Sequence, residues 1–140
     1  MSIHYFKEDV SSPKIDRKKL TNWIKQTIAS EKKIIGEISF IFCSDNYLLE
    51  INKKFLNHDY FTDIITFDYV ENGVISGDIF ISCDRVKDNA SEYKTDYLVE
   101  LSRILIHGVL HLIGYKDKCE KDKLLMTQKE DYYLNCLLNS

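Results

Sequence analysis

The stretch from His107 to Asp117 reads HGVLHLIGYKD, a pattern of the form H-x3-H-x2-G-x2-D. Residues four apart lie about one turn apart on one face of a helix, so His107 and His111 can direct both imidazoles at a single ion. Gly114 is the residue type that ends a helix in a left-handed turn, after which the chain can bring Asp117 back to the same point. Two neutral nitrogens and one carboxylate suit Zn²⁺, with a fourth position left for water. The pattern therefore predicts one Zn²⁺ per chain on His107, His111 and Asp117.

The segment that carries both histidines, from about Asp96 to Ile113, is apolar on nearly every side. Leu98, Leu101, Leu105 and Leu112 fall on one side of the expected helix, and Ile106, Val109 and Ile113 fall on another. A helix that is apolar nearly all round is buried. We therefore expect this helix at the centre of the fold, where it gives the metal site a rigid support.

The patterns on either side of this helix predict the remaining elements. Strands are expected at residues 3–7, 34–43, 64–67 and 74–82, and helices at about 16–32, 46–55, 84–93 and 121–138. The expected N-caps are Asp16, then Ser44 or Asp45, and then Asp84. The side chains expected to face the core include Trp23, Phe55, Tyr93, Leu124, Leu125 and Tyr132.

The turn Glu71-Asn72-Gly73 predicts an antiparallel pair between the last two strands, the second of them interrupted near Gly77. The resulting order is β-α-β-α-β-β-α-α-α. It predicts an α/β (α+β) fold: one domain over residues 1–140, with a small mixed four-stranded sheet and about five helices around the buried histidine-bearing helix.

Length and composition are those of an ordinary globular domain. The chain has 140 residues, of which 44% are hydrophobic and 29% charged, enough for an independent core. It lacks an apolar run of the ~18 residues that a membrane span needs, and its N-terminus does not resemble a secretory signal. Its four cysteines show no C-x2-C spacing, which favours free thiols in a reducing compartment. We therefore expect a cytoplasmic protein with no membrane partner.

The formal net charge of −3 disfavours non-specific duplex binding, which depends on basic surfaces. One basic cluster adjoins the predicted metal site and consists of Lys116, Lys118, Lys121 and Lys123. These lysines are either a solvated helix face or a phosphate-steering surface. Cys119, two residues after Asp117, is either a spare metal ligand or a free thiol.

The run HGVLHLIGY, with Met126 and Glu130 downstream, resembles the signature of the YbeY family of bacterial metal-dependent endoribonucleases. Asn52, TDIITF at 62–67 and GDIFI at 77–81 resemble the family's other recurrent blocks, in the same order. The resemblance implies a mixed sheet packed on helices, with a metal in a cleft. It also implies a role in ribosomal RNA maturation, at the 3′ end of the small-subunit RNA, and in ribosome quality control. Single-stranded ribosomal RNA and the ribosome are the expected partners, and a monomer is expected.

The chain departs from the family pattern at three positions. Asp117 stands where the family supplies a third histidine, which makes the site one charge more negative. Leu56 stands where the family commonly has an arginine thought to handle RNA, and Phe61 stands where proline is usual. The role of that arginine is therefore absent or falls to another residue. The candidates for it are Lys53, Lys54 and His58.

Three functions are compatible with this pattern. The first is a zinc-dependent, single-strand-specific endoribonuclease, in which water on the metal does the chemistry and Lys116, Lys118 or backbone N–H groups near Gly108 hold phosphate. The second is a non-catalytic ribosome assembly factor with a structural metal. The third is a metal-dependent hydrolase of peptides or esters, which Gly108 disfavours because H-E-x-x-H proteases carry their general base at that position.

The general base of the first function is not identifiable from the residues. Asp63 and Asp78 interrupt otherwise apolar strands, and each is either a functional carboxylate or a cap for a local turn.

Overall fold

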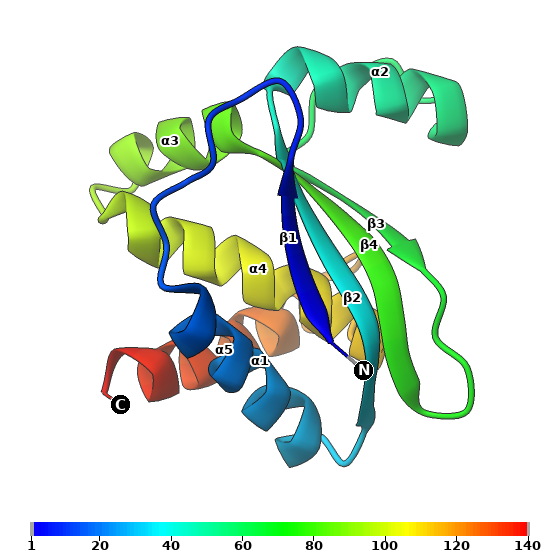
Figure 1. Ribbon diagram of the computed structural model, residues 1–140, viewed down its shortest axis with the longest axis vertical. Helices are drawn as coiled ribbons and strands as arrows, with labels where there is room; N and C mark the ends of the chain where they lie inside the picture. The colour runs from blue at the N-terminus through cyan, green and yellow to red at the C-terminus, as the bar shows by residue number, and fades with distance from the viewer. Residues whose placement is uncertain (1, 140) are drawn as a thin grey trace.

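The computed structural model describes residues 2–139, so the two ends of the predicted 1–140 domain lie outside the described residues. The chain runs β1 (Ile3–Lys7), α1 (Arg17–Ser30), β2 (Ile34–Cys43), α2 (Asp45–Leu56), β3 (Ile64–Asp68), β4 (Val74–Ser82), α3 (Cys83–Glu92), α4 (Tyr97–Ile113) and α5 (Glu120–Leu138). Figure 1 shows these elements in their spatial arrangement. The predicted order of strands and helices is confirmed.

The four strands form one mixed sheet in the order β1-β2-β4-β3. β1, β2 and β4 run parallel, and β3 pairs antiparallel with β4 as an edge strand. The turn that joins β3 to β4 contains Asn72 and Gly73, both with positive φ, at 53° and 75°. These are the residue types that adopt left-handed backbone most readily, so the predicted hairpin is confirmed.

The predicted interruption near Gly77 is wrong, because β4 is continuous and the register shift lies between Ile35 and Ile38 of β2. Gly77 instead allows a close approach. A Cβ there would lie 2.5 Å from the carbonyl oxygen of Phe67 and 2.9 Å from a methyl group of Leu112.

Helix α4 passes behind the strands in Figure 1 and packs against the sheet. Its Gly108 sits against the strands: a Cβ there would lie 2.9 Å from Cγ2 of Ile79 and 3.0 Å from Cδ1 of Ile64. Side chains of β3 and β4 thus fill the space that this glycine leaves. α1 and α5 flank α4, whereas α2 covers a smaller apolar cluster made by Cys43, Leu48, Ile51 and Ile65. The prediction that the histidine helix is central and buried is confirmed.

Several predicted caps and core positions differ from the structure. Asp16 caps α1 and Ser44 caps α2, but Ser82 caps α3, while the Asp84 carboxylate accepts the backbone N–H of Asp45. The exposed side chains that were expected in the core are Phe55, Tyr93, Leu98, Leu124, Leu125 and Tyr132. In α5 the buried face consists of Met126, Glu130, Tyr133, Leu134 and Leu137. Of the four side chains that the apolar pattern of this helix predicted in the core (Leu124, Leu125, Tyr132 and Leu137), only Leu137 is buried, and the buried face also includes a glutamate.

No helix within residues 2–139 combines the length and the apolar character that crossing a bilayer requires. All four cysteines are free thiols: Cys43 is buried, Cys83 half-buried, and Cys119 and Cys136 exposed.

One half-buried carboxylate connects α1, α5 and the loop between α4 and α5. Glu31, at the C-terminal end of α1, accepts hydrogen bonds from the hydroxyls of Tyr115 and Tyr133 and from Lys129 Nζ. Burial alone would raise the pKa of Glu31, but the hydrogen bonds from Tyr115, Tyr133 and Lys129 bring it below its usual value. The ionised form of Glu31 is therefore more favourable in the folded protein than in the unfolded chain.

We expect Glu31→Gln to reduce the free energy of unfolding by about 1.5–3 kcal/mol at pH 7, the range for hydrogen bonds to a charged group. Because the folded pKa is lowered, this stabilisation is present above the unfolded pKa of about 4.3 and is lost as the pH falls through the folded value. Urea unfolding of both proteins at pH 7, 5, 4 and 3 measures the difference. Glu50→Gln, which affects a glutamate that is 74% exposed, should change stability by less than about 1 kcal/mol. A wild-type advantage that stays constant down to pH 3 would contradict the assignment.

Candidate metal centre

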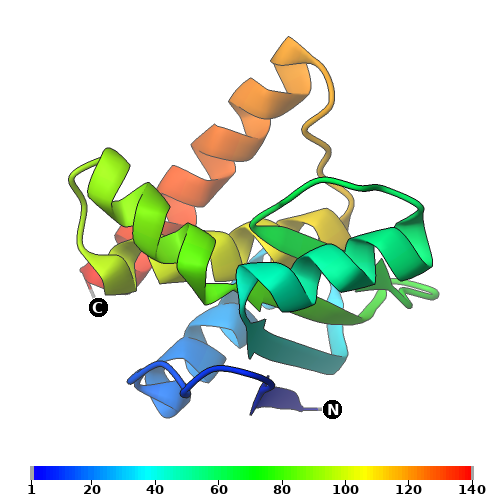
Figure 2. The ribbon, with the colours of Figure 1, turned by 90° about the horizontal axis from the view of Figure 1, so that it is seen from above.

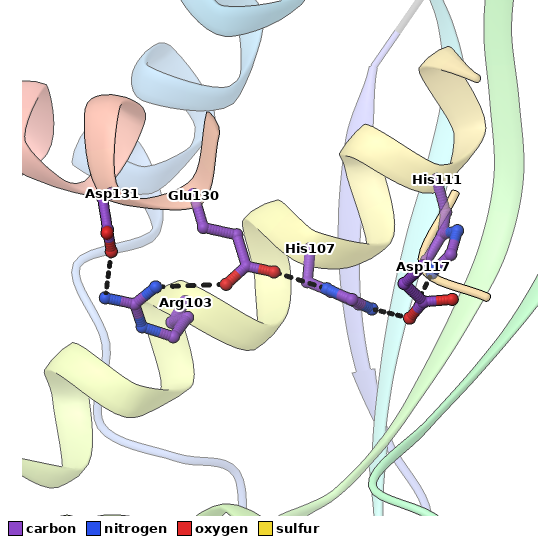
Figure 3. Close-up of polar contacts among 6 residues, drawn as sticks. All are labelled: Arg103, His107, His111, Asp117, Glu130 and Asp131. Carbon is purple, nitrogen blue, oxygen red and sulfur yellow. Dashed lines mark hydrogen bonds and ion pairs between the residues drawn. The ribbon is translucent and has the colours of Figure 1, made fainter. Parts of the chain in front are cut away.

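Three side chains that could bind a metal converge at the end of α4. The Asp117 Oδ2 atom lies 3.4 Å from Nε2 of His107 and 3.3 Å from Nε2 of His111. Figure 3 shows both imidazoles directed at this oxygen. In the described part of the chain this is the one group of three or more His, Cys, Asp or Glu side chains whose ligand atoms all lie within 4.8 Å of one another. The structure therefore brings together the three residues that the sequence pattern singled out.

The local backbone explains this convergence. His107 and His111 are one turn apart on α4, which ends at Ile113. Gly114 follows with φ 126°, and its N–H bonds the carbonyl oxygens of Leu110 and His111. Glycine adopts that backbone conformation without steric cost, so the chain can turn back and bring Asp117 to the histidines.

A second set of residues holds His107 in place from its other side. Glu130 on α5 lies 2.6 Å from Nδ1 of His107, which leaves Nε2 facing Asp117. Arg103 binds the same carboxylate through Nη1 at 3.1 Å and reaches Asp131 through Nη2 at 2.8 Å. The chain of contacts from Asp131 to Asp117 is shown in Figure 3. A carboxylate on the far nitrogen of a histidine fixes its ring orientation and tautomer.

The charges around His107 favour a cation at this point. Burial alone would lower the pKa of His107, but the hydrogen bond and charge of Glu130, together with Asp117 and Asp63, raise it. Burial raises the pKa of Asp63, and the nearby His107 partly offsets this rise. Two imidazoles and a carboxylate within reach of one point, amid further carboxylates, form a donor set that fits a divalent ion such as zinc.

The three convergent residues lie in the wall of a cleft with a volume of about 480 Å³. The cleft lining is formed by Asn52, Leu56, His58, Tyr60, Thr62, Asp63, Ile64, Ile65, Thr66, Asp68, His107, His111 and Asp117. Figure 2 shows that the loop from α2 to β3 and the loop from α4 to α5 lie on the same side of the molecule, where they border this cleft.

Asp63 and Asp78, for which the sequence allowed either a functional or a structural role, lie in different places. Asp63 lines the cleft beside the histidines. Asp78 lies on β4 outside the cleft lining, where its carboxylate accepts a hydrogen bond from the Tyr69 hydroxyl at 3.4 Å.

Several other predicted participants lie away from the cleft. Lys116 and Lys118 are exposed and do not line the cleft. Gly108 is buried in the middle of α4 against Ile79 and Ile64 and does not line the cleft, so the expected phosphate contact from backbone N–H groups near it stays a prediction. Cys119 is exposed at the start of α5 and does not belong to the convergent group.

The candidates to replace the family arginine also differ in position. Lys53 pairs with Glu50 and Asp59, and Lys54 lies over the ring of Phe55. Of the three candidates only His58 lines the cleft, beside Leu56.

Sequence reasoning gave Glu130 no role beyond the family resemblance and did not single out Arg103 or Asp131. One local signal was present. Glu130 lies four residues after Met126 and four before Leu134, so a charged side chain interrupts the buried stripe of α5. A fully buried glutamate is rare unless it is paired, and such an interruption indicates a partner elsewhere in the fold.

Comparison with known proteins identifies the family. The family model described as Endoribonuclease YbeY matches residues 5–138. This chain belongs to the YbeY family. A relative from Parabacteroides distasonis, named Endoribonuclease YbeY, is 48% identical over 137 residues, covering 98% of this chain and 96% of its own. Another of the same name, from Flavobacterium psychrophilum, is 56% identical over 110 residues, or 79% of each chain. The family resemblance predicted from the motifs is confirmed.

A solved structure supports the fold. The solution structure of TM1509 from Thermotoga maritima matches with a TM-score of 0.70 and 26% sequence identity, covering 98% of this chain and 89% of that chain. The predicted fold class is therefore confirmed.

We expect Glu130→Gln to weaken zinc binding by about 10-fold, because the loss of a carboxylate on a ligating histidine typically costs 10–100-fold in metal affinity. Competition with a chromophoric chelator measures the dissociation constant. Asp131→Asn is the matched control, since Asp131 also binds Arg103 but is 60% exposed and does not touch His107. Its zinc affinity should stay within about 2-fold of wild type. An unchanged affinity in Glu130→Gln would remove this carboxylate from the support of the site.

Proposed function

We propose that this chain is a zinc-dependent endoribonuclease that cleaves single-stranded RNA, with His107, His111 and Asp117 holding one Zn²⁺. The observation that carries the proposal is the convergence of these three side chains in the wall of an open cleft. Membership of the Endoribonuclease YbeY family supports the same activity. By resemblance to that family, we propose ribosomal RNA as the substrate, in maturation of the 3′ end of the small-subunit RNA and in ribosome quality control.

The residues of the site would hold the ion in the wall of the cleft. The chemistry that such an ion supplies is Lewis-acid activation of a phosphodiester or of water. His107 and His111 would supply nitrogen ligands through Nε2, and Asp117 would supply an oxygen ligand. Glu130 and Arg103 orient His107 from behind the ligand set. Cleft-lining residues beside the ligands leave room for an RNA backbone.

The cleft rim offers aromatic surface for unpaired bases. The rings of His58 and Tyr60 are stacked with centroids 5.1 Å apart, and Tyr60 is 56% exposed. The buried Asn52 side chain holds this loop by donating to the carbonyl oxygen of Tyr60 at 2.9 Å. Aromatic side chains stack on single-stranded bases without sequence preference. We infer that this pair contributes RNA contacts at the rim where Leu56 replaces the family arginine.

The alternative functions receive less support. A structural zinc requires four protein ligands in a closed shell. Within the described residues, three donor side chains converge in an open cleft, and Cys119 is not among them. A peptidase of the H-E-x-x-H type requires a carboxylate where this chain has the buried Gly108. The open site therefore favours catalysis on an extended substrate.

The decisive test is cleavage of a single-stranded RNA by purified protein, with and without chelator. His107→Ala/His111→Ala, prepared identically, controls for contaminating nucleases. We expect wild type to cleave, chelation to abolish cleavage, added zinc to restore it, and the variant to lose at least 100-fold in rate. Equal cleavage by both preparations, or none by either, would overturn the nuclease assignment in favour of an assembly factor.

We expect Tyr60→Ala to weaken binding of single-stranded RNA by about 5–100-fold, because base–aromatic stacking contributes roughly 1–3 kcal/mol per base. Fluorescence anisotropy with a labelled oligonucleotide in the presence of chelator separates binding from cleavage. Tyr93→Ala is the control, because Tyr93 is 67% exposed at the end of α3, away from the cleft. Equal affinities for wild type and Tyr60→Ala would exclude stacking at this rim.

A further inference from the structure

Asp117 differs from the two histidines in how it is held. His107 and His111 project from a buried helix, whereas Asp117 lies in the loop between α4 and α5. In the described structure, the hydrogen bonds and ion pairs of its carboxylate are with His107 and His111 alone. Those contacts would be replaced by ligand bonds when a metal is present. The position of this carboxylate therefore depends on whatever fixes the loop.

Tyr115, which lies two residues before Asp117, fixes the loop. The backbone N–H of Tyr115 bonds the carbonyl oxygen of Leu110 at 3.0 Å, continuing from the end of α4. The Tyr115 hydroxyl donates to Oε1 of Glu31 at 2.5 Å, across 84 residues of sequence. Lys129 Nζ lies 5.5 Å from the centre of the Tyr115 ring. Contacts from the backbone, the hydroxyl and the ring face thus hold this residue.

Glu31 is a rigid anchor for that hydroxyl. Its side chain is 10% exposed, and its second oxygen accepts hydrogen bonds from the Tyr133 hydroxyl and from Lys129 Nζ, the latter at 3.2 Å. Tyr133 is itself buried, and its carbonyl oxygen accepts the indole N–H of Trp23 at 2.7 Å. Two helices, α1 and α5, therefore hold the carboxylate that in turn holds the loop.

We propose that Glu31, acting through the Tyr115 hydroxyl, positions Asp117 as the third metal ligand. Glu31 and Tyr115 are positioning residues, since neither belongs to the proposed ligand set. This inference rests on the metal site proposed above. The simpler role for the cluster is to join α1 to α5. Tyr133 shares that role and makes the same kind of hydrogen bond to Glu31, but it does not adjoin Asp117, so it provides a matched control.

The experiment measures the Zn²⁺ dissociation constant of the full chain, with zinc as the only added ligand, by competition with a chromophoric chelator. Tyr115→Phe removes one hydroxyl and keeps the ring. We expect it to weaken zinc binding by about 10-fold, as is typical when an outer-shell partner is lost. Tyr133→Phe should stay within about 2-fold of wild type, because Lys129 Nζ still holds the second oxygen of Glu31 and the Tyr115 hydroxyl keeps its own bond to the first. Urea unfolding of both variants checks that the fold is retained. In an Asp117→Ala background, Tyr115→Phe should cause no further loss, because its effect acts through Asp117.

Other outcomes have distinct meanings. Equal weakening by Tyr115→Phe and Tyr133→Phe, or an undiminished effect of Tyr115→Phe in Asp117→Ala, would overturn the positioning role while leaving the metal site intact. Unchanged zinc binding in Asp117→Ala would remove Asp117 from the site and overturn this inference. The site itself would still stand if His107→Ala/His111→Ala abolished binding. No zinc binding by wild type would overturn the metal site and this inference together.

Discussion

The structure depends on a buried helix that carries two imidazoles. A polar group that is largely removed from water and left unpaired costs several kcal/mol, so a histidine on a buried helix requires a polar partner. α4 is apolar nearly all round, and its histidines meet that requirement with carboxylates from outside the helix, Glu130 from α5 and Asp117 from the following loop. Among residues 2–139 no buried side-chain nitrogen or oxygen lacks a hydrogen-bond partner. The carboxylates that bond these half-buried histidines also shape the proposed metal site.

Helix α5 supports the site in two separate ways. Glu130 contacts a histidine directly, while Tyr133 and Lys129, from the same helix, fix the Glu31 carboxylate that anchors the Asp117 loop. Glu130 and Tyr133 lie on the face of α5 that packs inward, and Lys129 is half-buried. Supports of this kind matter because a ligand set must be held in place before the ion arrives if binding is to be tight. The helix thus couples core packing to the geometry of the site.

The proposed function requires an acidic chain to bind RNA. The chain has a net charge of −3 and a leucine at position 56. Electrostatic attraction therefore contributes less to RNA binding than it would in a basic groove. In the proposal, exposed aromatic rings at the rim would supply an alternative that does not depend on charge. His58 and Tyr60 lie in the same loop as the residue that departs from the family proline, Phe61, whose ring lies 5.3 Å from the guanidinium of Arg85.

The sequence by itself determined the features that depend on neighbouring residues. The four-residue spacing of His107 and His111, the glycine that stops α4 and the short return to Asp117 are all local, so the convergence of these three side chains could be predicted from 11 residues. The order of elements and the hairpin at Asn72 and Gly73 follow from periodicity and turn chemistry for the same reason. Tertiary structure alone decided which face of α5 is buried, because that face includes Glu130, whose partner lies 23 residues away. It likewise decided the contact between Glu31 and Tyr115, since hydrogen bonds between distant residues leave no periodic trace in a chain and form only when the helices pack.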